Sequence, residues 1–562
     1  MRRLRALLLL IGLAVAMSAS HARAQGAGLG TVDFPTSARS EEAQAHFLRG
    51  VAALHSFWYP VALEEFRAAT AIEPDFMMGY WGEALAHNHP IWGDPQETEA
   101  ARKVLAKIRI TPKLTPREQA YLQAVKILYG PGEKPARDWA YAEAMAEIHR
   151  DYPEDLEAAA FYSLALLGTA YPNRSPDAAT PDDPAALRTR MRAAAVAQEV
   201  YRKEPNHPGA AHYILHAFDD PNHAVLALPA ARRYAEIAPA APHALHMPSH
   251  IFLQLGMWPE AAASNEASWK ASVELGEPNY HGLHWLLYAY LQQGRYNVAE
   301  PLLATMRESL AGLPEGDVRM RAYGAYTLAT MAATFVVETE RWEAADALIG
   351  APPQQPARAE AKPGAGPYQA FAALARTPAV FARGLAAAKT GSAGTGSADA
   401  QRSIDALEAT REQIAGVAVP FVARLDPVLK IQAMEIAAAV DAGKGDFDQA
   451  IRTMKEAIAL TDAMPPPTGP PLVIKPPHEL LGEILLAAGR PEDAARQFTA
   501  ALFRHPDRAR SLLGAARAAA RSGDSENAMA FYSEFLRQWK RADPGLPELS
   551  EARKSPDQAG AQ

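Results

Sequence analysis

A spaced pattern of small and aromatic residues recurs along the chain and constrains its fold more than any other feature. A Gly is followed two residues later by an aromatic residue, and three residues after that by an Ala. The full pattern occurs at three places: Gly256, Trp258 and Ala261; Gly294, Tyr296 and Ala299; Gly445, Phe447 and Ala450. The flanking segments have helical periodicity and are rich in Ala, Leu, Glu, Arg and Gln. Because Gly and Pro recur where a helix must stop, each unit is predicted to be a helix, a tight turn and a second helix.

The same Gly-to-Ala offset continues toward the C-terminus without the aromatic residue. Equivalent alanines are 34 residues apart at two places, Ala227 to Ala261 and Ala494 to Ala528. This pattern resembles the tetratricopeptide repeat (TPR) family, in which small residues let paired helices approach and aromatic residues fill the gap between hairpins. The resemblance covers most of the chain. It implies an all-α fold, a right-handed superhelical solenoid of helix-turn-helix repeats.

The N-terminus has the layout of a secretory signal peptide. Three arginines among the first five residues precede the apolar run Ala6–Met17, and Ala22-Arg23-Ala24 offers a cleavage site between small residues. The alternative is a membrane anchor, but this run is short for a bilayer span. We therefore expect residues 1–24 to be removed and the mature protein to be periplasmic or secreted. No later stretch is apolar enough to predict stable membrane insertion after cleavage.

Composition shifts suggest how the remaining chain is organised. We expect N-terminal TPR-like helices in 25–200, central repeats with a His-rich concave face in 201–350, an irregular helical and loop region in 351–430, and C-terminal TPR repeats in 431–562. Two stretches rich in Pro, Gly, Ala and Ser are predicted to be loops, Pro352–Pro367 and Thr390–Asp399. The prolines of Met464–Pro477 exclude a helix there. That segment either drapes over the repeats or is a simple spacer, and we favour the spacer.

Composition also excludes several classes of function. The 562 residues contain no Cys, which excludes disulfides, thiolate metal sites and a Cys nucleophile. A formal net charge of -8 argues against nucleic acid as a partner. The chain has no phosphate-binding loop, no dinucleotide fingerprint, no G-x-S-x-G elbow and no H-E-x-x-H motif.

Histidines are concentrated in the central repeats. Nine of the 17 lie between His207 and His284, and they fall in register. The positions eighteen residues before the anchor alanines Ala227, Ala261 and Ala299 are Gly209, His243 and His281. The positions fifteen residues before them are His212, His246 and His284. The positions eleven residues before them are His216, His250 and Tyr288. Seven of these nine equivalent positions are therefore His.

This spacing predicts a metal site. Residues three or four apart share one face of a helix, and equivalent helices of neighbouring repeats lie side by side. Neutral imidazole is a common ligand of Zn, Cu, Ni and Fe, and a site needs three or four ligands. We predict a divalent transition metal, Zn, Cu, Fe or Ni, held from the set His212, His216, His243, His246, His250, His281 and His284. Asp219 and Asp220 follow on the first helix and could act as ligands or as acceptors for the imidazoles. In the TPR family, these first-helix positions line the concave groove.

The other histidines are predicted to have ordinary or undecided roles. His149, His478 and His505 fit satisfied helix positions, and His207 and His223 fit loop or cap roles. The roles of three remain open: His55, His87 and His89.

A second resemblance links the His segments to a narrower group. The segments His207–His216 and His243–His250, together with Tyr80-Trp81-Gly82 and Glu479–Gly482, resemble exported bacterial TPR-like proteins of uncertain function. This resemblance implies no particular reaction.

Two functions of different classes therefore remain open. The first is an exported metal-binding protein, which would be a metalloenzyme if an open coordination position activates water or oxygen. The second is an interaction scaffold whose concave groove binds a peptide or partner protein without metal. In the second case the histidines only modify the binding properties of the groove. They would then line a polar groove, form a buried hydrogen-bond network or make a pH-sensitive surface.

Overall fold

The chain folds as helices alone throughout the part that can be described. The computed structural model describes residues 28–91, 96–170, 184–350, 373–391, 395–417, 420–465 and 467–559. Within these ranges every regular element is an α-helix or a one-turn 3-10 helix, and no strand occurs. The predicted all-α fold of paired helices is confirmed. The expected signal peptide, residues 1–24, and the expected loop Pro352–Pro367 lie outside the described residues.

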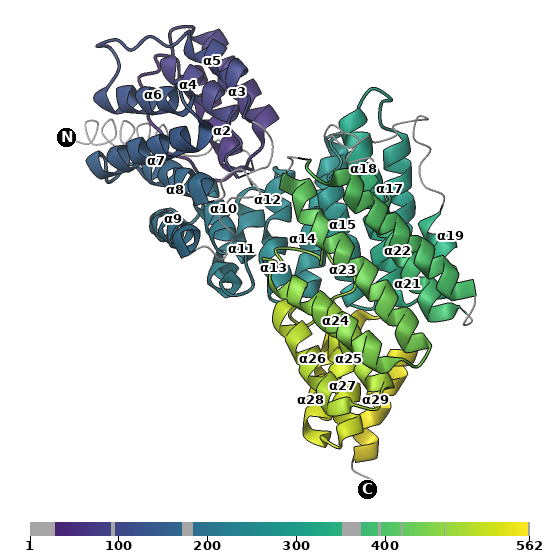
Figure 1. Cartoon of the computed structure of the whole chain (residues 1–562). Coiled ribbons are helices and arrows are strands. Elements are labelled where there is room, and N and C mark those ends of the chain that lie inside the picture. Colours follow the sequence, from purple (N-terminus) through teal and green to yellow (C-terminus); the bar gives the residue numbers. More distant parts are fainter. Residues whose placement is uncertain are drawn as a thin grey trace, which may run out of the picture. The chain divides into compact units, whose positions relative to one another are not determined.

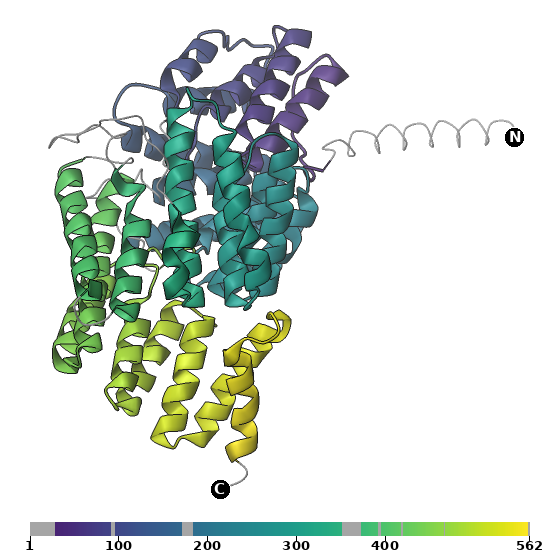
Figure 2. The ribbon, with the colours of Figure 1, turned by 90° about the vertical axis from the view of Figure 1, so that its right-hand side faces the viewer.

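The chain divides into two compact units, each made of helices that pack against their neighbours in sequence (Figure 1 and Figure 2). Of the described residues, the first unit comprises 28–91, 96–170, 184–219 and 223–251, and the second consists mainly of those from Phe252 onward. This division falls inside the region 201–350 that was expected to form one block. His281 and His284 are assigned to the second unit, and the other five predicted ligands are assigned to the first.

The first unit begins with α2 and ends within α13. Its helices are α2 (Glu41–His55), α3 (Tyr59–Ile72), α4 (Met77–Ala86), α5 (Thr98–Leu105), α6 (Pro116–Leu128), α7 (Lys134–Asp151), α8 (Leu156–Ala170), α9 (Pro184–Lys203), α10 (Pro208–Ala217), α11 (Ala224–Ile237), α12 (Pro242–His246) and α13 (Pro248–Gln254). The Ser40 side chain caps α2, and a reciprocal capping box of Thr115 and Glu118 starts α6.

The second unit contains the remaining helices. They are α14 (Trp258–Glu274), α15 (Tyr280–Gln292), α16 (Tyr296–Ala299), α17 (Pro301–Ala311), α18 (Val318–Thr339), η1 (Trp342–Ala344), α19 (Ala345–Ile349), α21 (Thr377–Thr390), α22 (Thr395–Ile414), α23 (Pro420–Gly443), α24 (Phe447–Asp462), α25 (Pro477–Ala487), α26 (Pro491–Arg504), α27 (Ala509–Ser522), α28 (Ser525–Gln538), η2 (Trp539–Arg541) and α29 (Pro547–Ala559). Within 351–430, which was expected to be an irregular helical and loop region, the described residues form the helices α21 and α22 and the start of α23. Helix α22 also begins inside the predicted loop Thr390–Asp399.

The repeated Gly and Ala positions have the roles that the pattern predicts. The Gly residues between paired helices adopt positive φ, 65° at Gly256 and 81° at Gly523, a conformation that favours Gly at a tight helix-ending turn. The anchor alanines Ala261, Ala299 and Ala494 are buried, because a small side chain lets the paired helices approach closely. The repeat pattern therefore specifies helical hairpins directly.

The same packing of a Phe ring against a Gly of the next helix occurs in both units. The buried ring of Phe66 lies against Gly82, and the buried ring of Phe498 lies against Gly514, so that a Cβ at either Gly would overlap the ring. Each Phe precedes its Gly by sixteen residues. An aromatic ring thus fills the space that the Gly leaves on the next helix in both units.

The Pro-rich segment Met464–Pro477 is non-helical over its described residues, as predicted, until α25 begins at Pro477. It is not a simple spacer. Val473, Ile474 and Lys475 are buried in the second unit, and the carbonyl of Pro467 accepts a hydrogen bond from Gln254 Nε2 at 2.8 Å. Burial of the two aliphatic side chains favours the packed path.

None of the described helices is both long enough and apolar enough to cross a membrane.

Candidate metal centre

Three short helices of the first unit carry the central histidines. Helix α10 begins after His207, whose ring Nδ1 accepts a hydrogen bond from the Ala210 backbone N–H at 3.0 Å. His207 therefore caps this helix, as predicted. His212 and His216 follow one turn apart on α10, while α12 carries His243 and His246 and α13 carries His250.

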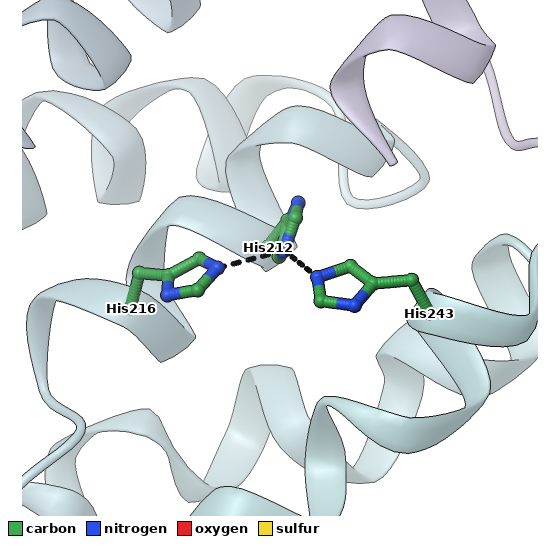
Figure 3. Close-up of side chains that lie close together, drawn as sticks. All are labelled: His212, His216 and His243. Carbon is green, nitrogen blue, oxygen red and sulfur yellow. Dashed lines mark hydrogen bonds between the residues drawn. The ribbon is translucent and has the colours of Figure 1, made fainter. Parts of the chain in front are cut away.

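His212, His216 and His243, here called the His triad, converge on one point. The Nε2 atom of His212 lies 3.0 Å from that of His216 and 3.1 Å from that of His243. Figure 3 shows the rings of His216 and His243 reaching toward His212 from either side. One ring nitrogen from each of the three residues lies within 4.8 Å of the others. Two helices therefore bring three potential ligand atoms together, as the register of the histidines predicts.

A backbone hydrogen bond fixes the orientation of His212. Its Nδ1–H donates to the carbonyl oxygen of His55 at 2.7 Å, so that in the neutral ring Nε2 carries the lone pair. One lone pair accepts one hydrogen bond, yet the Nε2 atoms of both His216 and His243 approach it. A cation at the centre would instead be met by one lone pair from each ring.

Burial keeps the triad neutral. The ring of His212 is fully buried, and this burial lowers the pKa of His212 to about 3. The pKa values of His216 and His243 are also far below the ordinary range, chiefly through burial and then through the neighbouring imidazoles. All three rings are therefore neutral near pH 7, which is the form that binds metal.

The spacing of the triad matches that of metal ligands. Imidazole nitrogens about 2.0–2.1 Å from a tetrahedral ion are about 3.3 Å apart. The two separations from His212 Nε2, 3.0 and 3.1 Å, are close to this value, and all three ligand atoms lie within 4.8 Å of one another. The spacing of the triad is therefore compatible with a bound metal ion.

A pair of imidazoles follows the triad in the same unit. The Nε2 atoms of His246 and His250 lie 3.1 Å apart, and the rings of His243 and His246 are 6.5 Å apart between centroids. The Nδ1–H of His250 donates to a carboxylate oxygen of Asp219 at 2.8 Å. Asp219 thus orients an imidazole, as the sequence suggested, and leaves the His250 Nε2 lone pair directed at His246.

The last two predicted ligands, His281 and His284, lie on α15 in the second unit. The exposed His281 packs its ring against Trp285, with 5.0 Å between centroids. Burial lowers the pKa of His284 to about 4, and no hydrogen-bond partner of its buried Nε2 occurs among the described residues. At the position equivalent to His216 and His250, Tyr288 accepts a hydrogen bond from Arg508 at 3.0 Å.

The sequence did not assign a role to His55, which belongs to a buried network behind the triad. His55 Nε2–H donates to Glu157 at 2.7 Å, while its Nδ1 lies 2.7 Å from the Tyr213 hydroxyl. The other Glu157 oxygen lies 3.1 Å from His207 Nε2. Burial alone would raise the pKa of Glu157, but the imidazoles of His207 and His55 lower the pKa to about 2. This network holds the backbone carbonyl that orients His212. Partners 50 and 102 residues apart leave no periodic signal in the sequence.

A Glu157→Gln substitution is expected to destabilise the first unit by about 1–3 kcal/mol at pH 7, because an amide cannot accept from both imidazoles and leaves a buried group unpaired. The folded-state pKa of Glu157 lies below its ordinary value of 4.5, so the carboxylate stabilises the fold above pH 4.5. This stabilisation is lost as the pH falls toward 2. Urea unfolding at pH 7 and pH 3 should show the difference between wild type and variant shrinking in acid. The exposed Glu154→Gln serves as control, and equal losses at both pH values would contradict the assignment.

Comparisons with known proteins agree with the repeat assignment. A tetratricopeptide repeat family model matches residues 480–547. No curated protein matches the sequence. Among solved structures, the chain resembles yeast Tom70 at 11% identity, covering 93% of this chain and 90% of that one, with a TM-score of 0.29. It also resembles a monomeric IFIT1 mutant with Gppp-AAAA at 11% identity, 88% and 90% coverage and a TM-score of 0.32.

A third similar structure is the TPR domain of P58(IPK), at 14% identity, 67% and 96% coverage and a TM-score of 0.21. Likeness at this level carries no inference about ligand or activity. The family match covers α25 to α28, where Phe498 packs against Gly514 as Phe66 packs against Gly82 in the first unit. Over its described residues the chain is all-α, and its segment 480–547 matches the tetratricopeptide repeat family.

Proposed function

We propose that this protein binds a divalent transition metal, Zn, Cu, Fe or Ni, through His212, His216 and His243. The observation that carries the proposal is the approach of two Nε2 atoms to the single lone pair of His212. Hydrogen bonding alone offers one lone pair of His212 to two approaching nitrogens, whereas a cation accepts a lone pair from each of the three rings. Nitrogen ligands suit each of the four metals, and three protein ligands leave a coordination position for water or another small molecule.

The His246 and His250 pair is proposed to lie beside this ion without coordinating it. Its Nε2 atoms face each other, and Asp219 engages the far nitrogen of His250. This is the arrangement that orients ligating imidazoles in metal sites. The pair therefore places two further ring nitrogens, 3.1 Å apart, in the same unit as the triad, where they could contribute to a second ion.

Export is proposed on the N-terminal sequence alone, because positive charge, a short apolar run and small residues before Gln25 form a signal peptide. Protein for metal analysis should accordingly be isolated untagged from the periplasm of a Gram-negative host without chelators. Its intact mass shows whether residues 1–24 have been removed.

Elemental analysis of this protein tests the metal proposal. Wild type is expected to retain, or to take up from added salt, about one ion per chain. A His216→Gln/His243→Gln variant is expected to lose that ion while keeping its far-UV helicity, because two of three ligand atoms are replaced. His478→Gln is the matched control, since His478 bonds Gln497 in the second unit and should leave the metal in place.

A wild-type protein that neither carries nor takes up any of the four metals would overturn the proposal. The remaining function would then be the interaction scaffold, and capture of groove partners would be the next measurement.

A further inference from the structure

A phenylalanine stands at a position where the repeat pattern of this chain has glycine. Phe57 precedes the buried Tyr59 by two residues and the buried Ala62 by five, which is the spacing that follows Gly256. The turn at Phe57 also ends its helix in the same way. The backbone N–H of the next residue, Trp58, donates to a carbonyl five residues earlier at 2.9 Å, and the equivalent bond after Gly256 measures 2.8 Å. Phe57 is therefore the counterpart of the repeat Gly.

The backbone at Phe57 has the conformation that favours Gly. Its φ is 54°, close to the 65° of Gly256, and a bulky residue is strained in this region. Glu340, five residues before the buried Ala345, is another non-Gly residue at this repeat position, with φ of 53°. The Glu340 carboxylate accepts a hydrogen bond from Arg510 at 3.1 Å. A side chain that replaces the repeat Gly thus makes a contact that Gly cannot make, and the surrounding structure holds the strained backbone.

The contact that Phe57 makes is with the His triad. Its buried ring lies edge-on to His212, with 4.4 Å between ring centroids. The same ring stacks on His216 and His243, with centroids 5.6 and 5.7 Å apart and interplanar angles of 27° and 19°. The turn that holds Phe57 begins at His55, whose carbonyl accepts the hydrogen bond from His212 Nδ1–H. This turn therefore orients one imidazole of the triad and contacts all three.

An aromatic ring against the imidazoles limits what else an ion in the triad can bind. The ring carries no lone pair for a metal, and it fills space that water molecules would otherwise occupy beside the ligands. Such an apolar shell controls the access of solvent to a metal site. Zn²⁺ accepts tetrahedral coordination by three protein ligands and one water, whereas Ni²⁺ prefers square-planar or tetragonal arrangements. A triad with one side covered by a ring therefore favours Zn²⁺, because fewer additional ligands can reach the ion.

We propose that Phe57 is a specificity-determining residue of the metal site, whose ring keeps the number of ligands low and selects Zn²⁺ over Ni²⁺. This role rests on the proposed metal binding by the triad and goes beyond it, because it decides between candidate metals. It also accounts for a strained aromatic residue at a position where Gly would relieve the strain.

Metal titrations of the untagged full chain test this role. Competition against a chromophoric chelator gives the affinities for Zn²⁺ and Ni²⁺. Co²⁺ is the spectroscopic probe, because its visible absorption is intense in tetrahedral sites and weak in six-coordinate ones. Wild type is expected to give the intense absorption. Phe57→Gly removes the ring and restores the repeat residue, so it is expected to lower the ratio of Zn²⁺ to Ni²⁺ affinity about tenfold and to weaken the Co²⁺ absorption.

Two control variants separate the ring from the backbone. Glu340→Gly makes the same restoration at the equivalent position of the second unit, so it should leave the affinity ratio and the Co²⁺ absorption unchanged. Phe57→Leu keeps an apolar side chain against the triad and should retain most of the preference for Zn²⁺. If Phe57→Gly does not fold, Phe57→Asn carries the test, because Asn is a smaller residue that tolerates positive φ.

The outcomes distinguish this role from metal binding itself. Equal affinity ratios in wild type and Phe57→Gly, or a weak six-coordinate Co²⁺ absorption in wild type, would overturn the role of Phe57 and leave metal binding by the triad in place. A wild type that takes up none of the metals would overturn the proposed function, and the role of Phe57 with it.

Discussion

Replacing His212 with Gln is expected to lower metal affinity at least about 100-fold, since loss of a direct ligand should exceed the 10- to 100-fold cost of losing an outer partner. His212 is the member of the triad that both other rings approach, at 3.0 and 3.1 Å. Its Nδ1–H is also anchored on the His55 carbonyl, which orients the Nε2 lone pair before an ion arrives. A Gln at this position loses both the ligand nitrogen and the fixed orientation. Competition titration against a chromophoric chelator measures the loss directly.

The comparison with a second variant makes the expectation specific. His246→Gln/His250→Gln removes as many imidazoles as a double triad variant but leaves His212, His216 and His243 in place. It is therefore expected to keep the ion of the triad with a change of less than about tenfold. If this variant lost the metal and His212→Gln retained it, the ion would belong to the pair and the assignment to the triad would be wrong.

Replacing Arg508 with Met is expected to have the largest effect on stability, about 3–5 kcal/mol. The fully buried guanidinium lies 2.6 Å from Glu338 and 2.8 Å from Glu479. Burial alone would raise the pKa of Glu479, but Arg508 and Lys475 lower that pKa. Removing the guanidinium leaves the Glu338 carboxylate with the hydrogen bond from Gln292 Nε2 and strands part of the negative charge in the core. A buried carboxylate without its cation is far more costly than the loss of a hydrogen bond.

Urea unfolding followed by circular dichroism measures this loss as a shift of the transition of the second unit. Arg537→Met is the matched control, because the exposed Arg537 pairs with Glu534 and Asp507 at the surface and should change stability by less than about 1 kcal/mol. An Arg508→Met protein within about 1 kcal/mol of wild type would show that the buried charges are not coupled as the geometry indicates.

Much of the local structure could be predicted from the residues. The Gly–aromatic–Ala spacing predicts helical hairpins for two reasons. Gly adopts the positive φ of the turn without strain, as at Gly256, and the small side chain of Ala lets the helices approach closely, as at Ala261. The N-cap role of His207 followed from its place before a helix. The three- and four-residue offsets predicted that His212 and His216 share a face, since the helical period determines that relation.

Relations between repeats were less predictable. Equal offsets from the anchor alanines place His281 and His284 in the same predicted set as His212, and their role as ligands stays a prediction. At the equivalent position, Tyr288 pairs with Arg508, which follows it by 220 residues. The prolines of the segment 464–477 exclude a helix there, and the sequence favours a spacer. Composition carries no information about what a non-helical segment packs against, and the burial of this segment shows that the spacer interpretation is wrong.

The sequence by itself therefore determined the helical repeats, the concentration of histidines on α10 and α12, and the absence of thiolate chemistry. These follow from backbone preferences and from periodicities that act over a few residues. Only the tertiary structure decided which three imidazoles meet and that the His55 carbonyl orients one of them. The contacts of His212 with His243 and with the His55 carbonyl join residues 31 and 157 positions apart, and distances across such separations depend on how whole helices pack.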